Sequence, residues 1–207
     1  MKLTQDHRDI LDEVLKWRRD VRHFRRDPLD TEVLARLRQR MDCAPSVGNA
    51  RPWRVLQVDS PAMRASVIES FEACNAEAAE NYGGQARADY LALKLAGLRE
   101  APVHLAVFTD TTVSEGRGLG RQTMPETLSY STVMAIHTLW LAARAENIGV
   151  GWVSILDPGT VADILEVPGT WSLTGYLCLG YPQRPSDTPL LHEAGWQANT
   201  ATRWRVV

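Results

Sequence analysis

The chain has 207 residues, of which 44% are hydrophobic and 23% charged, and its formal net charge is −2. This length and composition predict one globular domain over residues 1–207, with enough apolar side chains for a sizeable core. No stretch approaches the roughly 18 consecutive apolar residues of a membrane span, and the near-neutral charge argues against a general nucleic-acid-binding surface.

The cysteines, the histidines and the N-terminus bear on metal binding and compartment. Cys43, Cys74 and Cys178 are odd in number and lack a CxxC pair, which argues against a disulfide framework and a zinc site. The histidines also lack metal-ligand spacing, and we interpret His104 and His137 as structural. The opening MKLTQDHRDILDEVL is acidic where a signal peptide would be apolar. We therefore expect a cytoplasmic protein without a metal site.

The N-terminal quarter contains two predicted helices, a loop and a strand. Apolar residues at helical spacing predict the first helix over 6–18, and the second follows Asp30 or Thr31, either of which suits the N-cap. The segment PSVGNARPW, residues 45–53, is a predicted loop because of its Pro, Gly and Asn content. Residues 53–59 alternate enough to form a strand.

The middle of the chain predicts two helices, a strand and a long loop. Residues 62–81 and 85–99 are expected to be helical, with Tyr82-Gly83-Gly84 as the break between them. After Pro102 the run VHLAVFTD is almost continuously apolar and fits a buried strand. Residues 111–127 contain several glycines and a proline without periodicity, so we expect a loop, and long ordered loops are often functional.

The C-terminal part predicts a central helix and two strands. Residues 131–149, STVMAIHTLWLAARAENIG, are apolar on almost every side and should form a buried helix that Gly149 ends. VGWVSILDP predicts a strand followed by a short helix over 158–166, which Asp157 would cap. SLTGYLCLGYP predicts a further apolar strand. The fold class expected is α+β, with helices around a small sheet.

The strongest local signal is the basic cluster Lys16–Arg26, KWRRDVRHFRR, in which six of eleven residues are Lys or Arg. The guanidinium groups of Arg18, Arg19 and Arg22 can converge where a helix gives way to a turn, and such forks suit a phosphate monoester. The ordinary alternative is a solvated helix end, where carbonyl groups favour positive charge. Asp20 would repel a phosphate, so it either holds an arginine or acts on another group.

Three further segments carry polar groups. In PSVGNARPW, Ser46, Val47 and Gly48 can aim backbone N–H groups and a hydroxyl at a ligand, although a plain helix-to-strand turn also explains the loop. GLGRQTMPETLSYS has neither the Lys-Ser/Thr ending of a P-loop nor the GxGxxG of a dinucleotide fold, which excludes both. Ser154 lies in an apolar predicted strand without a GxSxG elbow, which disfavours a hydrolase.

The order of these segments resembles the flavin-dependent nitroreductase superfamily over about residues 10–185. The matching segments are RRDVRHF, APSVGNARPW, the central apolar helix, GVGWVSILDP and LGYP. Asp20 stands where ordinary nitroreductases usually have a serine, and GLGRQTMPETLSYSTV and WVSILDP are typical of the dimethylbenzimidazole synthase branch. This branch fragments reduced FMN with molecular oxygen, giving D-erythrose 4-phosphate and 5,6-dimethylbenzimidazole, the lower ligand of vitamin B12.

The resemblance implies a nitroreductase-like fold, in which helices surround a central, mainly antiparallel sheet and an intertwined homodimer builds each FMN site from two chains. It implies that FMN contacts Arg18, Arg19, Asp20, Val21, Arg22, Ser46, Leu95, Ser154 and Arg184. Asp20 and Ser154 would be the catalytic residues: Asp20 as general base beside the ribityl chain, Ser154 as a hydrogen-bonding group near the flavin N5. Because the reaction must exclude water, we expect a lid within residues 71–99.

Two alternative functions stay open. One is an ordinary FMN-dependent NAD(P)H nitroreductase, and the other is a flavin-binding protein without enzymatic activity. The source of electrons is open as well: NAD(P)H is one candidate, and a separate flavin reductase that delivers reduced FMN is the other. The resemblance does not extend to residues 186–207.

Overall fold

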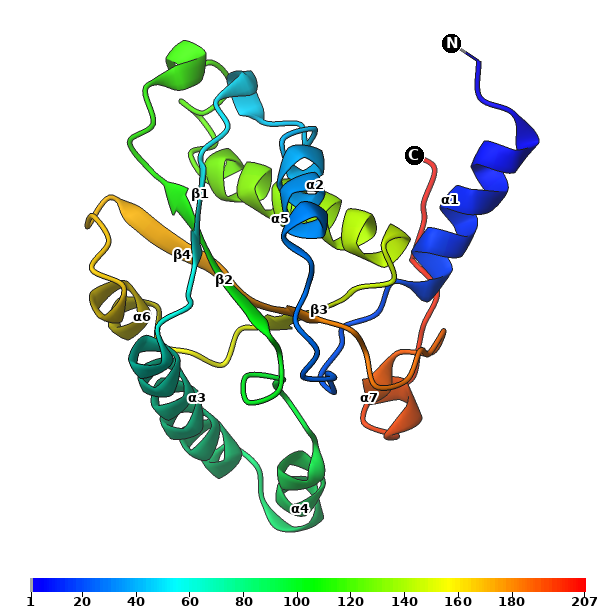
Figure 1. Ribbon diagram of the computed structural model, residues 1–207, viewed down its shortest axis with the longest axis vertical. Helices are drawn as coiled ribbons and strands as arrows, with labels where there is room; N and C mark the ends of the chain where they lie inside the picture. Colours follow the sequence, from blue (N-terminus) through cyan, green and yellow to red (C-terminus); the bar gives the residue numbers. More distant parts are fainter. Residues whose placement is uncertain (1) are drawn as a thin grey trace.

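The computed structural model describes residues 2–207 and contains a four-stranded antiparallel sheet between layers of helices (Figure 1). The strand order is β1-β2-β4-β3, with β1 at Trp53–Gln57, β2 at Val103–Asp110, β3 at Gly149–Val153 and β4 at Trp171–Gly180. The helices are α1 (Gln5–Trp17), α2 (Thr31–Met41), α3 (Pro61–Glu80), α4 (Gly84–Ala92), α5 (Thr127–Ala145), α6 (Pro158–Ile164) and α7 (Leu190–Glu193), with 3-10 turns η1 (Val47–Asn49) and η2 (Glu115–Gly118). The α+β fold expected from the sequence is confirmed.

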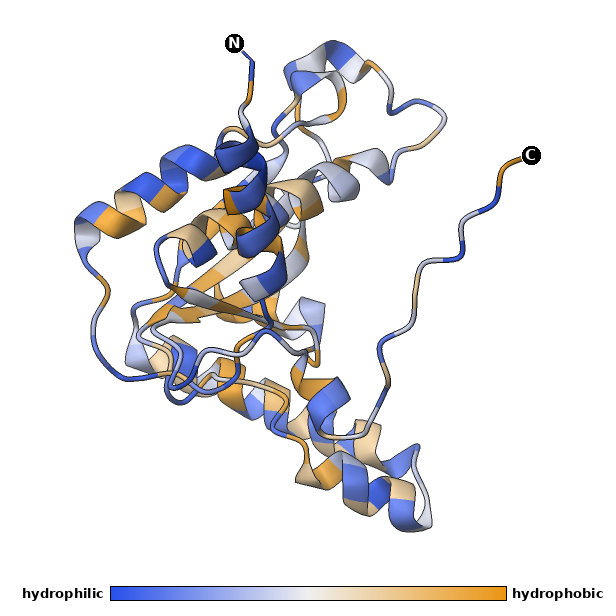
Figure 2. Cartoon of the chain, turned by 90° about the vertical axis from the view of Figure 1, so that its right-hand side faces the viewer, coloured by the Kyte–Doolittle hydropathy of each residue, from blue (hydrophilic) through white to orange (hydrophobic). Residues whose placement is uncertain are grey.

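Side-chain alternation along the strands gives each face of the sheet its own core. On β4, Leu177 and Leu179 point towards α2 and α5, whereas Tyr176 and Cys178 point towards α3 and α6. All four side chains are fully buried. In Figure 2 the hydrophobic colouring concentrates on this central sheet. The paired cores hold the sheet rigid, so its edges can position functional groups.

Local capping begins several helices where the sequence predicts them. The Asp30 side chain accepts a hydrogen bond from the backbone N–H of Glu32 and is the N-cap of α2. Asp157 accepts from the backbone N–H of Thr160 at 2.6 Å and caps α6, as expected. The hydrogen bonds from the side chain and the backbone N–H of Thr160 lower the pKa of the Asp157 carboxyl.

The prediction of a helix over 85–99 is wrong beyond Ala92. Residues 93–99 leave the helix and pack against the segment that follows α1. A side chain at Gly97 would overlap the ring of Phe24, and Leu98 is buried beside it. Tertiary packing therefore overrides the helical propensity of this segment.

The prediction that 131–149 forms a helix buried on every side is only partly right. Helix α5 begins four residues earlier, at Thr127, and ends at Ala145. One face packs on the sheet through residues such as Ala135 and Ile136, while Tyr130, Val133 and Met134 are exposed. His137 is exposed on the same helix, so it is not part of the core, where a structural histidine was expected. Helix α5 thus has more apolar side chains than this chain packs into its core.

The C-terminal segment contributes α7 and then leaves the body of the molecule. Residues 197–207 contain no helix or strand and are exposed, and Figure 2 shows them running outward. Trp204 is 86% exposed. None of the helices within residues 2–207 is both long and apolar enough to cross a membrane.

His104 gives the fold a predictable dependence on pH. Its ring is fully buried on β2, and Nδ1 lies 3.1 Å from the hydroxyl oxygen of Tyr176. Burial, assisted by the nearby Arg64, lowers the pKa of His104 to about 4. The unfolded chain, with a histidine pKa of about 6.5, therefore binds the proton more readily, and stability falls as the pH drops from 7 to 4.

We expect this histidine to account for about 3 kcal/mol of lost stability over that range. Urea unfolding at pH 7 and pH 4 measures it in the wild type, in His104→Gln and in His7→Gln, which changes an exposed histidine on α1. His104→Gln should show the smaller pH dependence, and His7→Gln should follow the wild type. Equal pH dependence in all three proteins would contradict the assignment.

Candidate functional site

The segment after α1 extends the sheet at the free edge of β3. Asp20 forms an isolated parallel bridge with Val150, and the backbone N–H of Val21 donates to the Val150 carbonyl oxygen at 3.0 Å. Two glycines of β3 allow this approach: a side chain at Gly149 would meet the Val21 side chain, and one at Gly151 would overlap the Val21 carbonyl oxygen. The GVG pattern of β3 therefore gives Asp20 its place beside the sheet.

The Asp20 carboxylate is held by two hydrogen bonds from different parts of the chain. Oδ1 accepts from the backbone N–H of Trp152 at 2.9 Å, and Oδ2 accepts from Nε of Arg22 at 2.8 Å. The Asp20 side chain is 30% exposed and that of Arg22 is 15% exposed. Arg22 also donates through Nη1 to the Lys94 carbonyl oxygen at 3.2 Å. Asp20 thus orients an arginine and still presents a partly exposed carboxylate.

A cavity, here called the basic pocket, lies where α1, α5 and the C-terminal segment meet. Its lining includes Arg18, Arg19, Asp20, Val21, Arg22, Arg144 and Arg184. The Arg18 guanidinium lies 5.0 Å from the ring centroid of Trp140, and the Trp140 indole N–H donates to the Arg19 carbonyl oxygen at 3.1 Å. Trp140 thereby fixes both the backbone and one side chain of the basic cluster.

Arg19 has spare hydrogen-bonding capacity inside the basic pocket. Its terminal nitrogens donate to the carbonyl oxygens of Arg18 and Asp187, but its buried Nε has no partner among residues 2–207. Burial and the adjacent Arg18 lower the pKa of the Arg19 guanidinium. Within the described chain, neither Arg18 nor Arg19 pairs with a carboxylate. A phosphate monoester fits this site because it would supply both the charge and the acceptor oxygens.

Arg184 lines the basic pocket from the C-terminal side. Its side chain is 76% exposed and lies 3.6 Å from the carboxylate of Glu193. Lys16 similarly lies 3.4 Å from the carboxylate of Asp187. These exposed pairs are weak, so an incoming anion can displace them.

Ser154 and Leu95, two further residues expected to contact FMN, lie outside the basic pocket. Ser154 follows β3 directly, two residues after Trp152, so it lies at the end of the strand and not within it; its side chain is exposed. Leu95 is half-buried next to Lys94, whose carbonyl oxygen Arg22 contacts, but it is outside any helix. Neither residue lines the basic pocket. Ser154 is two residues from Trp152, which contacts Asp20, and Leu95 is next to Lys94, which contacts Arg22.

Ser46 is separated from the basic pocket within one chain. It precedes η1, and its hydroxyl accepts a hydrogen bond from the backbone N–H of Arg51 at 3.1 Å. The following N–H, of Val47, donates to the hydroxyl of Ser131 on α5. The structure therefore brings Arg18, Arg19, Asp20, Val21, Arg22 and Arg184 together and leaves Ser46 outside the pocket, near the N-terminal end of α5.

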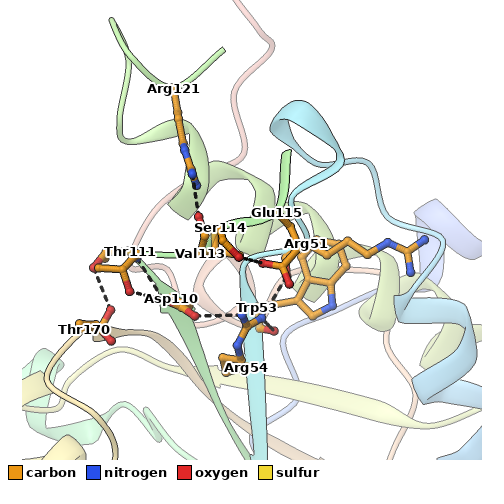
Figure 3. Close-up of polar contacts among 11 residues, drawn as sticks. Arg51, Trp53, Arg54, Asp110, Thr111, Val113, Ser114, Glu115, Arg121 and Thr170 are labelled. Carbon is orange, nitrogen blue, oxygen red and sulfur yellow. Dashed lines mark hydrogen bonds and ion pairs between the residues drawn. The ribbon is translucent and has the colours of Figure 1, made fainter. Parts of the chain in front are cut away.

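The loop that carries Ser46 is braced by a polar cluster that sequence reasoning did not identify (Figure 3). Arg54 pairs with Asp110 at 2.9 Å across β1 and β2 and also donates to the Arg51 carbonyl oxygen. Arg121 donates to the Val113 carbonyl oxygen at 2.6 Å. Arg54 thus links Arg51 to the end of β2, and Arg121 holds the long loop after β2 together. The two loops meet where Gly48 and Gly116 approach too closely for side chains.

Sequence reasoning also missed much of the wall of the basic pocket. Trp140 and Arg144 are four residues apart and hence on one face of α5, a spacing that could have identified them as neighbours. No comparable signal points to Ser186, Thr188 or Glu193, because a hydrophilic C-terminal segment has no periodicity.

The described residues contain no cluster of three or more His, Cys, Asp or Glu side chains that could hold a metal ion.

Comparisons with known proteins bear on this arrangement. The sequence model of the nitroreductase family matches residues 15–181. The chain is 58% identical to a 5,6-dimethylbenzimidazole synthase of Rhodobacter capsulatus over 204 residues, which covers 99% of each chain. It is 54% identical to another from Rhodospirillum rubrum over 191 residues, 92% of this chain and 90% of the relative. The solved structure of oxidised iodotyrosine deiodinase bound to FMN and 3-iodo-L-tyrosine shares the fold, with a TM-score of 0.71, 23% identity, and 95% and 96% coverage.

Proposed function

The chain belongs to the nitroreductase family, and on that premise we propose that it is a 5,6-dimethylbenzimidazole synthase. The reaction is the oxygen-dependent fragmentation of reduced FMN to 5,6-dimethylbenzimidazole and D-erythrose 4-phosphate. The observation that carries the proposal is the likeness, over nearly the whole length, to relatives of that name. The carboxylate of Asp20, fixed at the edge of the basic pocket, supplies the group that distinguishes this chemistry from ordinary flavin reduction.

The basic pocket is the proposed site of the FMN phosphate. Arg18, Arg19 and Arg184 would bind it, and the unpartnered Nε of Arg19 supports this role. Asp20, Val21 and Arg22 would then follow the ribityl chain towards Leu95 and Ser154. When bound, reduced FMN supplies the ring that reacts with oxygen and the ribityl C1′ carbon that enters the product.

Asp20 is the proposed general base that removes a proton from the ribityl C1′ carbon. A base must be held within hydrogen-bonding reach of the proton it accepts. The Trp152 N–H and Arg22 Nε occupy one lone pair on each oxygen and prevent the carboxylate from rotating. The remaining lone pairs are free to accept the proton, since the side chain is only partly buried.

Ser154 is the proposed hydrogen-bonding group at the flavin ring, and its replacement should separate binding from chemistry. Ser154→Gly removes one exposed hydroxyl beyond the end of β3, so FMN affinity should stay within about threefold of wild type. Product formation should fall by about 100-fold, with oxygen released as hydrogen peroxide instead. Fluorescence titration with FMN and chromatography of the product measure the two effects; a variant with wild-type product yield would remove Ser154 from the mechanism.

We also propose a homodimer in which the second copy completes each site. The exposed apolar face of α5, with Tyr130, Val133 and Met134, is a surface that a second copy would cover. Ser46, remote from the basic pocket of its own chain, would reach the FMN bound mainly by the other copy. The exposed C-terminal residues around Trp204 are available for the same interface.

Further parts of the proposal concern access and supply. Residues 71–99 would form the lid that excludes water. Molecular oxygen would be the oxidant, and electrons would come from NAD(P)H or from a separate flavin reductase. We place the reaction in the cytoplasm.

The deciding experiment supplies the purified protein with reduced FMN and air and identifies the product by chromatography and mass spectrometry. Formation of 5,6-dimethylbenzimidazole is the expected result. Flavin that stays intact and cycles with NADH would favour an FMN-dependent NAD(P)H nitroreductase. A protein without affinity for FMN would rule out both enzymes.

A further inference from the structure

The C-terminal segment 184–196 begins as part of the wall of the basic pocket. Ser186, Thr188 and Glu193 line the cavity, and the Asp187 carbonyl oxygen accepts a hydrogen bond from Arg19. The Ser186 hydroxyl is 2.8 Å from a carboxylate oxygen of Glu193, which itself pairs with Arg184. An anion bound by Arg19 and Arg184 would therefore act directly on this segment.

The same segment ends against the proposed lid. The ring of Trp196 meets that of Tyr82 edge-on at 5.5 Å between centroids and lies 6.1 Å from that of Tyr90. Tyr82 and Tyr90 stack on each other at 4.8 Å, which joins the end of α3 to α4. The hydroxyl of Tyr90 donates to the side-chain oxygen of Asn75 on α3. Trp196 thus contacts the α3–α4 connection at Tyr82 and helix α4 at Tyr90 through one aromatic cluster.

Hydrogen bonds within the segment make it stiff enough to connect its two ends. The backbone N–H groups of Trp196 and Gln197 both donate to the Leu191 carbonyl oxygen on α7, at 3.0 and 3.2 Å. Beyond Gln197 the residues are exposed and form no helix or strand. The part of the C-terminal segment that packs on the body of the molecule therefore includes the contact of Trp196 with the proposed lid.

The lid has a second attachment to the same pocket. The Lys94 carbonyl oxygen accepts from Arg22, and Lys94 pairs with Glu100 at 2.6 Å. An open depression lies beside α4 and is also lined by Gly195 and Trp196. Helix α4 is therefore attached near both of its ends, through Tyr82 and Lys94, and borders this depression between them.

We propose that Trp196 is a positioning residue that couples the basic pocket to the lid, so that a phosphate monoester in the pocket holds α4 in place over the reacting atoms. This inference rests on the proposed function for its substrate, FMN. The phosphate would immobilise segment 184–193 through Arg19 and Arg184. Trp196 would then be held in place as well, and its contacts would immobilise Tyr82 and Tyr90. Recognition of the phosphate and exclusion of water would then be a single event.

Limited trypsin digestion at Arg87, exposed in the middle of α4, tests the coupling without any turnover. Saturating oxidised FMN should slow cleavage of the wild type about tenfold, because proteolysis follows the population of the open lid. Riboflavin, which lacks the phosphate, should protect little, and inorganic phosphate added with riboflavin should restore part of the protection. Trp196→Ala should still bind FMN but lose the protection.

Three variants complete the experiment. Trp196→Phe should restore most of the protection. Leu3→Ala should behave as wild type, because Leu3 is 62% exposed and precedes α1. Tyr82→Ala should lose the protection, because it removes the other partner of the aromatic contact. Tyr82→Ala also serves if Trp196→Ala fails to fold. Protection by FMN that is undiminished in Trp196→Ala or Tyr82→Ala would overturn the coupling.

Product formation, measured in parallel on the wild type, separates this inference from the proposed function. Protection that depends on Trp196 without any 5,6-dimethylbenzimidazole would reject the proposed function and leave the coupling intact. Formation of 5,6-dimethylbenzimidazole without FMN-dependent protection would support the proposed function and reject the coupling. If both hold, Trp196→Ala should release more hydrogen peroxide per FMN consumed, and Trp196→Phe should reverse that change.

Discussion

Replacing Asp20 by asparagine should abolish formation of 5,6-dimethylbenzimidazole while FMN affinity stays within about threefold of wild type. The amide keeps the size of the side chain, and its oxygen can still accept from the Trp152 N–H or from Arg22. It cannot take up a proton as a carboxylate does, and the loss of a general base costs about 100-fold to 10,000-fold in rate. Single-turnover product assays and FMN titration measure the two quantities.

The adjacent pair Arg25–Asp27 offers a matched control for this variant. Nε of Arg25 donates to Asp27 at 2.8 Å with the same two-residue spacing as Arg22 and Asp20, but both side chains are more than half exposed. Asp27→Asn should therefore leave product formation unchanged. An Asp20→Asn protein as active as the wild type would remove Asp20 as the base.

Replacing Gly151 by alanine should damage both the fold and the basic pocket. The new methyl group would overlap the Val21 carbonyl oxygen, and backbone atoms cannot move aside as a flexible side chain can. We expect a loss of about 1–3 kcal/mol in the free energy of unfolding. Because Asp20 and Arg22 lie on the displaced segment, FMN affinity should fall as well.

Chemical denaturation and FMN titration check this expectation. Gly159→Ala is the control, since its methyl group would make only an ordinary contact, 3.5 Å from a carboxylate oxygen of Asp157. In the first turn of α6 that variant should be neutral or slightly stabilising. Gly151→Ala with wild-type stability and FMN affinity would show that the close approach of Val21 to β3 is not needed.

Residues 71–99, the proposed lid, show how far a prediction from local sequence pattern extends. Helix α3 and the break at Tyr82 follow from composition, but residues 93–99 also have helical propensity and do not form a helix. Gly97 against Phe24 and the Lys94 carbonyl against Arg22 determine their path. Phe24 and Arg22 are more than 70 positions away in the sequence, so no window around Lys94 contains that information.

The candidate site likewise contains residues that the sequence identifies and residues that only the structure brings into it. The identities of Arg18, Arg19, Asp20 and Arg22 were readable because one short segment carries them all. The roles of Trp140 and Glu193 were not, because they enter the basic pocket from α5 and the C-terminal segment. Val133 and Met134 made the helix predicted over 131–149 appear buried on every side, because sequence does not distinguish an exposed apolar surface from a core.

By itself the sequence determined the fold class and the positions of the strands and most helices, and it supplied the candidate residues for binding an anion and for a general base. Those features follow from periodicity, capping and the density of charge within short segments. Only the tertiary structure decided how Asp20 is held, which residues wall the basic pocket and what Trp196 contacts. The hydrogen bond from the Trp152 N–H to Asp20 joins residues 132 positions apart, and such a contact exists only once the strands have paired.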